Sequence, residues 1–326
     1  MTRARRALAV MVATGALTLT GCGIEERIVH LQPAPTENAD VGAPLRVEAA
    51  ERIAARVLSQ AAAADGEEAR AAIHVGPALR VANVRAERDV QSADAADVMI
   101  SDAPTVLAMS RGQEWPRAIL VATLDSATET QHLHVLVSTG PTDQFKIFGT
   151  APLLPAASVP GLGELAAGTS FEAATAEAPI DASADVDEYA KGLAFPEPGE
   201  TSVVGLDDPY AESLKRNAAE QAEAFDDLAD LAQSHAPIAD SILSFETVDG
   251  GRIVFAQMVR TATITLTEEA KELKIEDSGL QELSGKEVVT ESFTTEYLEN
   301  VLFVAPASGL AQLIGAEELV LRAEGS

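Results

Sequence analysis

The sequence predicts an α+β protein of two domains, each with an N-terminal helix or helices packed on a curved antiparallel sheet. Three observations predict this class. In each half of the chain, apolar residues first recur at helical spacing and then alternate with a period of two. The helical stretches precede the strands, which is the order typical of α+β folds. A Pro/Ala-rich segment, residues 156–206, separates the halves and is predicted to be a linker with a short helix.

The first domain is predicted over residues 45–155 and begins with helices. Apolar residues at helical spacing predict a helix over 45–63, which Asp65-Gly66 ends. A second helix is expected from 67 to the Gly-Pro step at 76–77, and a third follows it. The third helix is predicted at 78–88. Strands, in which apolar residues alternate with a period of two, are predicted at 98–100, 106–109, 117–124, 132–139 and 145–150.

The second domain, residues 207–326, opens with a long predicted helix. Asp207 or Asp208 can cap it, and Pro209 fits its first position because that residue needs no amide donor there. One apolar stripe continues to a stop near Ala236-Pro237.

Strands follow this helix. Asp249-Gly250-Gly251 predicts a tight turn between strands at 241–248 and 252–267. Because the second arm exceeds an average strand, we expect a bulge or a strong bend in it. The remaining strands are predicted at 273–275, 286–304 and 311–323.

The linker contains a weak calcium motif. Oxygen-bearing side chains alternate from Asp181 to Asp187, as in the first half of an EF-hand loop, but the glycine and the bidentate glutamate that complete the loop are missing. We therefore favour a short helix toward Leu193, capped by Ser183 or Asp185.

Residues 1–21 have the pattern of a signal peptide. Three arginines precede an uncharged run over 7–19, and small residues then lead to Cys22, the single cysteine of the chain. Without a second cysteine, Cys22 cannot form an intramolecular disulfide. The stretch Leu19-Thr20-Gly21-Cys22 resembles the lipobox of bacterial lipoproteins. The resemblance implies cleavage before Cys22 and attachment of diacylglyceryl and N-acyl (palmitate-type) chains there. The polar, proline-interrupted composition that follows predicts a flexible tether over residues 22–44.

Two C-terminal stretches carry a second resemblance, TVDGGRIVFAQMVRT and ENVLFVAPASGLAQLIGAEELVLRAEGS. They resemble an uncharacterised family of actinobacterial lipoproteins through turn and strand residues: Asp249-Gly250-Gly251, Arg260-Thr261 and Pro306. The order of elements resembles nuclear-transport-factor-like and cystatin-like α+β domains. These resemblances imply an architecture and no chemistry.

The amino-acid composition argues against several classes of binding function. The formal net charge of −28 disfavours nucleic-acid binding, because phosphate backbones would be repelled. Aromatic residues make up only 4% of the chain, which argues against sugar platforms and base-stacking surfaces.

Candidate site residues are few, and each has a structural interpretation that we prefer. His132 and His134 face one side of a strand, but no third ligand follows in sequence, so we interpret them as solvated. Trp115 is expected to anchor an edge of the first core. Glu268-Glu269 and Glu317-Glu318 are interpreted as solubilising charge, since neighbours on a strand point to opposite faces. Asp226, Asp227 and Asp230 are interpreted as part of the solvent-exposed face of the long helix that opens the second domain.

The sequence therefore predicts a lipid-anchored, extracytoplasmic, non-catalytic scaffold on the cell membrane, with Cys22 as the lipid attachment site and an envelope protein as its partner. We expect no catalytic residue, metal or cofactor. One alternative is a small-ligand-binding lipoprotein associated with transport. Another is an enzyme whose cone-shaped fold holds a pocket, with Asp102, Asp125 or His132 as its acid or base.

Overall fold

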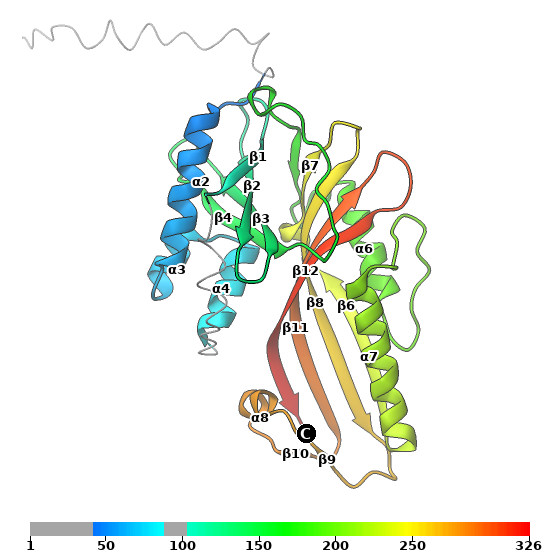
Figure 1. Ribbon diagram of the computed structural model, residues 1–326. Helices are drawn as coiled ribbons and strands as arrows, with labels where there is room; N and C mark the ends of the chain where they lie inside the picture. Colours follow the sequence, from blue (N-terminus) through cyan, green and yellow to red (C-terminus); the bar gives the residue numbers. More distant parts are fainter. Residues whose placement is uncertain (1–41, 88–102) are drawn as a thin grey trace, which may run out of the picture. The chain divides into compact units, whose positions relative to one another are not determined.

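The computed structural model describes residues 42–87 and 103–326, and these form an α+β fold (Figure 1). The predicted fold class is confirmed. The chain divides into a short unit, Met1–Ala39, and a compact unit, Asp40–Ser326, to which all described residues belong. Cys22, Asp102 and the strand predicted at 98–100 lie outside the described residues. No helix of the described part is long and apolar enough to cross a membrane.

The first sheet has four antiparallel strands in sequence order, β1-β2-β3-β4. Three helices cover one of its faces, because their buried stripes pack on Ile119, Val121 and Leu136. The predicted helices and the strands from 106 onward are confirmed. The elements are α2 (Val47–Ala62), α3 (Glu67–Ile73), α4 (Pro77–Glu87), β1 (Thr105–Met109), β2 (Arg117–Asp125), β3 (Thr130–Ser138) and β4 (Lys146–Pro152).

The second sheet has the order β12-β11-β8-β7-β5, and β6 also pairs with β8. β7 pairs with the first residues of β8, and β6 pairs with its later residues. Helices α6 and α7 pack on one face of this sheet. The elements are β5 (Phe171–Ala173), α6 (Ala182–Gly192), α7 (Pro209–Phe225), β6 (Ala229–Pro237), β7 (Leu243–Glu246), β8 (Arg252–Leu266), β9 (Leu273–Lys274), α8 (Ser278–Ser284), β10 (Val288–Val289), β11 (Ser292–Ala305) and β12 (Gln312–Gly325).

The long helix predicted at the start of the second domain ends earlier than expected, so this part of the prediction is wrong. α7 stops at Phe225, and Asp226 follows with a positive φ of 49°, which breaks the helix. Residues 229–237 are the strand β6 instead. Their burial alternates with a period of two, since Ala229, Leu231 and Gln233 are buried and the residues between them are exposed.

The segment predicted as a linker is part of the second sheet and its core. β5 pairs with β7, and α6 contributes Val186 and Tyr189 to the apolar cluster under the helices. The predicted caps of α6 are wrong. Asp181 occupies the N-cap, while Asp185 is buried and pairs with Arg252 at 2.9 Å, so its carboxylate serves the sheet and not the helix end.

The bulge expected in the long strand at 252–267, which is β8, is not found there. β8 keeps one register against β11 over its whole length. The register shifts fall between β11 and β12, at Glu296/Tyr297 and Leu302/Phe303. The short helix α8, capped by Asp277, is an element that the sequence analysis missed.

The two sheets meet in a continuous apolar cluster. Leu120 and Val135 of the first sheet join Phe245, Phe255 and Leu302 of the second. Two glycines allow this approach. A Cβ at Gly149 of β4 would lie 2.7 Å from the ring of Phe255, and one at Gly315 of β12 would lie 2.6 Å from the carbonyl oxygen of Pro152. The division into two domains that fold separately stays a prediction.

We expect Gly149→Ala to lower the free energy of unfolding by about 1–3 kcal/mol, because the added methyl collides with the Phe255 ring. In a Phe255→Leu background, the same substitution should cost less, with a coupling of about 0.5 kcal/mol or more. Urea denaturation of the four proteins of this cycle measures both values. An equal cost of Gly149→Ala in the two backgrounds would contradict this account of the sheet contact.

Candidate functional site

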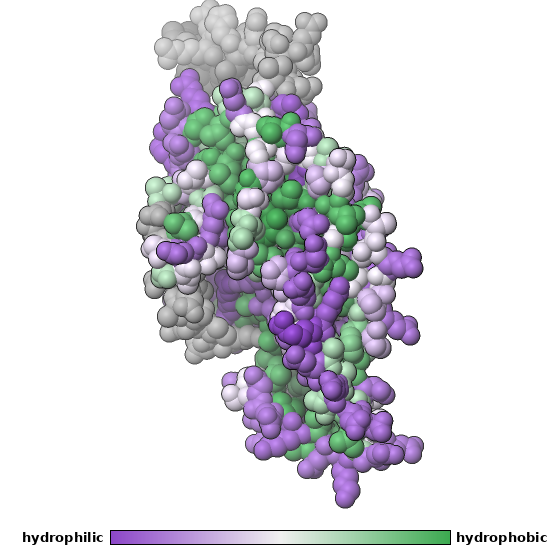
Figure 2. Space-filling model, turned by 45° about the vertical axis from the view of Figure 1, so that its right-hand side comes forward, coloured by the Kyte–Doolittle hydropathy of each residue, from purple (hydrophilic) through white to green (hydrophobic). Residues whose placement is uncertain are grey.

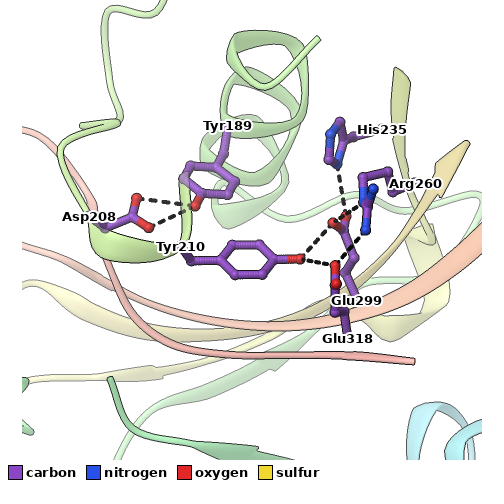
Figure 3. A network of polar contacts seen from close by, with 7 residues as sticks. All are labelled: Tyr189, Asp208, Tyr210, His235, Arg260, Glu299 and Glu318. Carbon is purple, nitrogen blue, oxygen red and sulfur yellow. Dashed lines mark hydrogen bonds and ion pairs between the residues drawn. The ribbon is translucent and has the colours of Figure 1, made fainter. Parts of the chain in front are cut away.

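The most connected polar cluster of the described residues surrounds Glu299, whose side chain is fully buried (Figure 3). The hydroxyl of Tyr210 donates to Oε1 of Glu299 at 2.7 Å, and Nδ1 of His235 lies 2.8 Å from Oε2. The Nε atom of Arg260 lies 3.4 Å from Oε1. A buried carboxylate needs such partners, because burial without them would remove its hydration uncompensated.

Strand register brings these side chains together. Arg260 of β8 is paired with His235 of β6 and with Tyr297 of β11, so all three side chains share one face. Two residues along β11, Glu299 is paired with Glu318 of β12 and reaches the same face. The cluster therefore spans four neighbouring strands.

Local structure at the start of α7 places Tyr210. Asp208 is the N-cap of this helix, and its Oδ1 accepts from the amide of Ala211 at 2.8 Å. Tyr210 then follows Pro209 in the first turn, directed at the sheet. Asp208 also accepts from the hydroxyl of Tyr189 on α6, at 3.1 Å to Oδ2. Burial raises the pKa of Asp208 and of Tyr189 above their ordinary values.

Arg260 connects the buried Glu299 to the partly exposed Glu318 at the edge of the cluster. Its Nη2 atom lies 2.7 Å from Glu318, and its guanidinium group stacks 3.7 Å from the ring centroid of Tyr297. Burial acts to lower the pKa of Arg260, but the carboxylates of Glu318 and Glu299 outweigh it and raise this pKa. Burial also raises the pKa of Tyr210, and the negative charge of Glu299 adds to the effect. Both side chains therefore stay in their ordinary protonation state.

The arrangement acts as a clamp between helices and sheet. Tyr189, Asp208 and Tyr210 link α6 and the N-terminus of α7 to the carboxylates on β11 and β12. Both oxygens of Glu299 are occupied by partners from the protein itself. Charge-assisted hydrogen bonds of this kind are strong when they are removed from water. The geometry therefore supports holding α7 on the sheet better than it supports acid or base chemistry.

A second polar chain lies on the opposite face of the same sheet. Arg80 of α4 donates to Gln257, Gln257 donates to Asn300, and Asn300 donates to Glu317, at 2.6, 2.8 and 3.3 Å. Arg85 of α4 pairs with Glu317 as well. This chain fastens α4 to β8, β11 and β12.

Glu317 and Glu318 thus serve opposite faces. The predicted divergence of their side chains is confirmed by the pairing of Glu317 with Asn300 and of Glu318 with Glu299. Their interpretation as solubilising charge is wrong, because each carboxylate holds a different helix through an arginine or a tyrosine. Glu268 and Glu269, by contrast, are exposed.

The histidines of β3 are buried and not solvated as predicted. His134 is fully buried between the hydroxyls of Thr123 and Thr150, at 2.8 and 3.0 Å. The ring of His132 lies on the same side, with centroids 6.4 Å apart. Burial lowers the pKa of His134 to about 3, and burial also lowers the pKa of His132. Within the described ranges, no group of three His, Cys, Asp or Glu residues could hold a metal ion.

The remaining candidates lie apart from the cluster. Asp125 is buried in a turn, where hydrogen bonds from Thr128 and the amide of Ala127 lower its pKa. Trp115 is half-buried at the start of β2, with the guanidinium of Arg117 4.1 Å from its ring centroid. The three aspartates interpreted as part of the solvent-exposed helix face are exposed, but they lie beyond the end of α7: Asp226, Asp227 and Asp230.

Sequence reasoning missed the residues that the fold brings together at this site. One signal for them was available. Arg260, Glu299 and Asn300 interrupt runs of apolar residues within strands, where an ionisable or amide side chain needs a partner. The identity of that partner depends on register between distant strands and could not be derived from spacing along the chain.

We expect Glu299→Gln to lower the free energy of unfolding by about 3–5 kcal/mol, because Arg260 loses its buried counter-charge and the amide cannot accept hydrogen bonds at both of its polar atoms. The matched control is Glu318→Gln, whose partly exposed side chain should cost about 1 kcal/mol or less. Urea denaturation at pH 7 compares them. Equal losses in the two variants would contradict a central role for Glu299.

The protein should lose stability on acidification through His134. Its pKa is about 3 in the folded state against an ordinary 6.5, so the unfolded chain gains a proton below pH 6.5 that the folded chain excludes. The contribution of His134 is complete above pH 6.5 and is lost as the pH falls toward 3, at about 1.4 kcal/mol per pH unit. His134→Gln replaces the imidazole with an amide that does not titrate, so the variant takes up no proton at this position when it unfolds. We expect the variant to lose about 2 kcal/mol less than the parent between pH 6.5 and pH 5, measured by urea denaturation. Parallel losses in the two proteins would refute the assignment.

Comparison of the chain with protein-family models, with curated proteins and with solved structures finds no match.

Proposed function

We propose that this chain is a lipid-anchored extracytoplasmic protein that acts as a non-catalytic interaction scaffold in the cell envelope. Two features support the proposal. The lipobox-like stretch ending at Cys22 provides the anchor. The clamp around Glu299 provides the scaffold, because it uses its ionisable groups to fix α6 and α7 to the sheet.

The observation that carries the scaffold assignment is the bonding of Glu299. A general acid or base must reach a substrate atom, and a nucleophile must be open to attack. Glu299 instead bonds Tyr210, His235 and Arg260 and has no exposed side-chain surface. The chain Arg80–Gln257–Asn300–Glu317 fixes α4 in the same manner on the other face. A sheet braced on both faces keeps its surface geometry constant, which suits presentation to a partner.

The outer surface is compatible with this role. Hydrophilic residues project from much of the face seen in Figure 2, with hydrophobic residues between them. The formal net charge of −28 favours a partner with a basic surface through long-range attraction.

Cys22→Ser should abolish acylation and with it normal lipid anchoring, because two or three acyl chains on one residue give stable anchoring that a polar tether cannot. We expect the variant in the soluble fraction or as an uncleaved precursor, while the parent stays with the membrane and shows acyl mass on its N-terminal peptide. Cell fractionation and mass spectrometry measure this. An unmodified N-terminus in the parent would contradict the anchor.

The scaffold assignment is tested by crosslinking in intact cells. Repeated capture of the same envelope protein by the parent chain supports it, and Glu299→Gln should weaken that capture by loosening α7. Recovery of no envelope protein over repeated experiments would contradict it.

A further inference from the structure

Three segments meet at the point where the described chain begins. The carbonyl of Gly42 accepts from the amide of Gly112, in the hairpin between β1 and β2, and the amide of Ala43 donates to Ala166, in the loop after β4. The covalent link toward Cys22 therefore starts at this place. A tether from Cys22 would join the body here.

The hairpin between β7 and β8 belongs to the same end. Its residue Val248 donates its amide to Gly161 of the loop that also holds Ala43, and Glu246 donates its amide to Ser170. Gly161 and Ala166 are five residues apart, so at most about 18 Å of chain separates these two attachments. Arg111 of the first hairpin forms an ion pair with Glu246 at 3.7 Å, which ties the two hairpins together.

The side chains at this end have the chemistry of a membrane interface. Val248 is 70% exposed, the highest value among the large hydrophobic residues of the described part. Trp115 is half-buried in the neighbouring hairpin, with Arg117 over its ring, and Arg111 is partly exposed. Trp and Arg are favoured at the headgroup level of bilayers, and exposed apolar tips insert below it. Three exposed acids also lie in these hairpins: Glu114, Glu246 and Asp249. Glu246 pairs with Arg111, and Asp249 accepts from the hydroxyl of Thr247.

We infer that the end formed by the hairpins 110–117 and 246–252 contacts the lipid surface to which the chain is anchored. This inference rests on the proposed anchor at Cys22. A flexible tether, as the sequence predicts for residues 22–44, would span about 25 Å on average, and the anchor would then keep this end near the bilayer. A weak contact then suffices, because tethering gives it an effective concentration in the millimolar range.

The opposite end of the second sheet provides a matched control. α8 packs near the C-terminal end of β8, since its Leu280 joins a cluster with Ile264 and Phe293. The strand β8 has 15 residues, Arg252–Leu266, and can therefore separate the two ends by up to about 46 Å. Leu283 of α8 is 38% exposed and is thus an apolar side chain far from the tether.

The test uses residues 22–326, produced without acylation and coupled through the thiol of Cys22 to a maleimide lipid in phosphatidylcholine vesicles that contain brominated lipid. One probe is Trp115→Phe with Val248→Trp, and the control is Trp115→Phe with Leu283→Trp. Bromine quenches tryptophan on contact, so we expect the Val248→Trp probe to be quenched at least about threefold more than the Leu283→Trp control.

A second arm keeps the native Trp115 as the reporter. Its quenching on coupled vesicles should fall in Val248→Asp, because a charge at the hairpin tip opposes insertion. Equal quenching of the two probes, or unchanged Trp115 quenching in Val248→Asp, would overturn the inference. Because the anchor is supplied chemically, absence of native acylation would leave this result standing and would be seen separately by mass spectrometry.

Discussion

Burial of the Glu299 carboxylate is the constraint on which the second sheet depends. A charge without any exposed surface must be paired, and its partners come from β6, β8 and α7. Each partner fixes one element: His235 fixes the edge strand, Arg260 the centre of the sheet, and Tyr210 the first turn of the covering helix. The register between β8, β11 and β12 cannot slip by one residue without moving Glu299 to the other face.

That same alternation explains why the sheet is braced twice. Neighbouring residues on β11 and β12 point to opposite sides, so Glu317, bonded to Asn300, contacts α4 through Arg85, while Glu299 and Glu318 contact α7 through Tyr210. The polar layers therefore lie back to back across the sheet. Apolar packing would hold the helices without selecting one position along the strands, whereas hydrogen bonds and ion pairs fix a specific alignment.

Between the sheets, contact depends on small residues instead of polar ones. Gly149 and Gly315 lie where β4 and β12 approach each other, and the backbone of Leu154 donates to Ile314 there at 2.8 Å. Phe255 fills the space that the missing side chain of Gly149 leaves. The aliphatic, aromatic-poor composition thus still produces a dense junction, because glycine allows the few large rings to pack directly on a strand.

The sequence by itself determined the α+β class, the helices α2 to α4, the hairpin at Asp249-Gly250-Gly251 and most strands, since these depend on local periodicity and turn chemistry. It could not find the end of α7 at Phe225, because residues 229–237 keep enough apolar spacing to suit a helix until pairing with β8 selects a strand. Nor could it identify the clamp. Tyr210, His235, Arg260 and Glu299 are distant in sequence, and only strand pairing and helix docking place them within hydrogen-bonding distance. The buried state of His134 and the paired state of Glu318 have the same origin, since burial is a property of what packs against a residue and not of the residue alone.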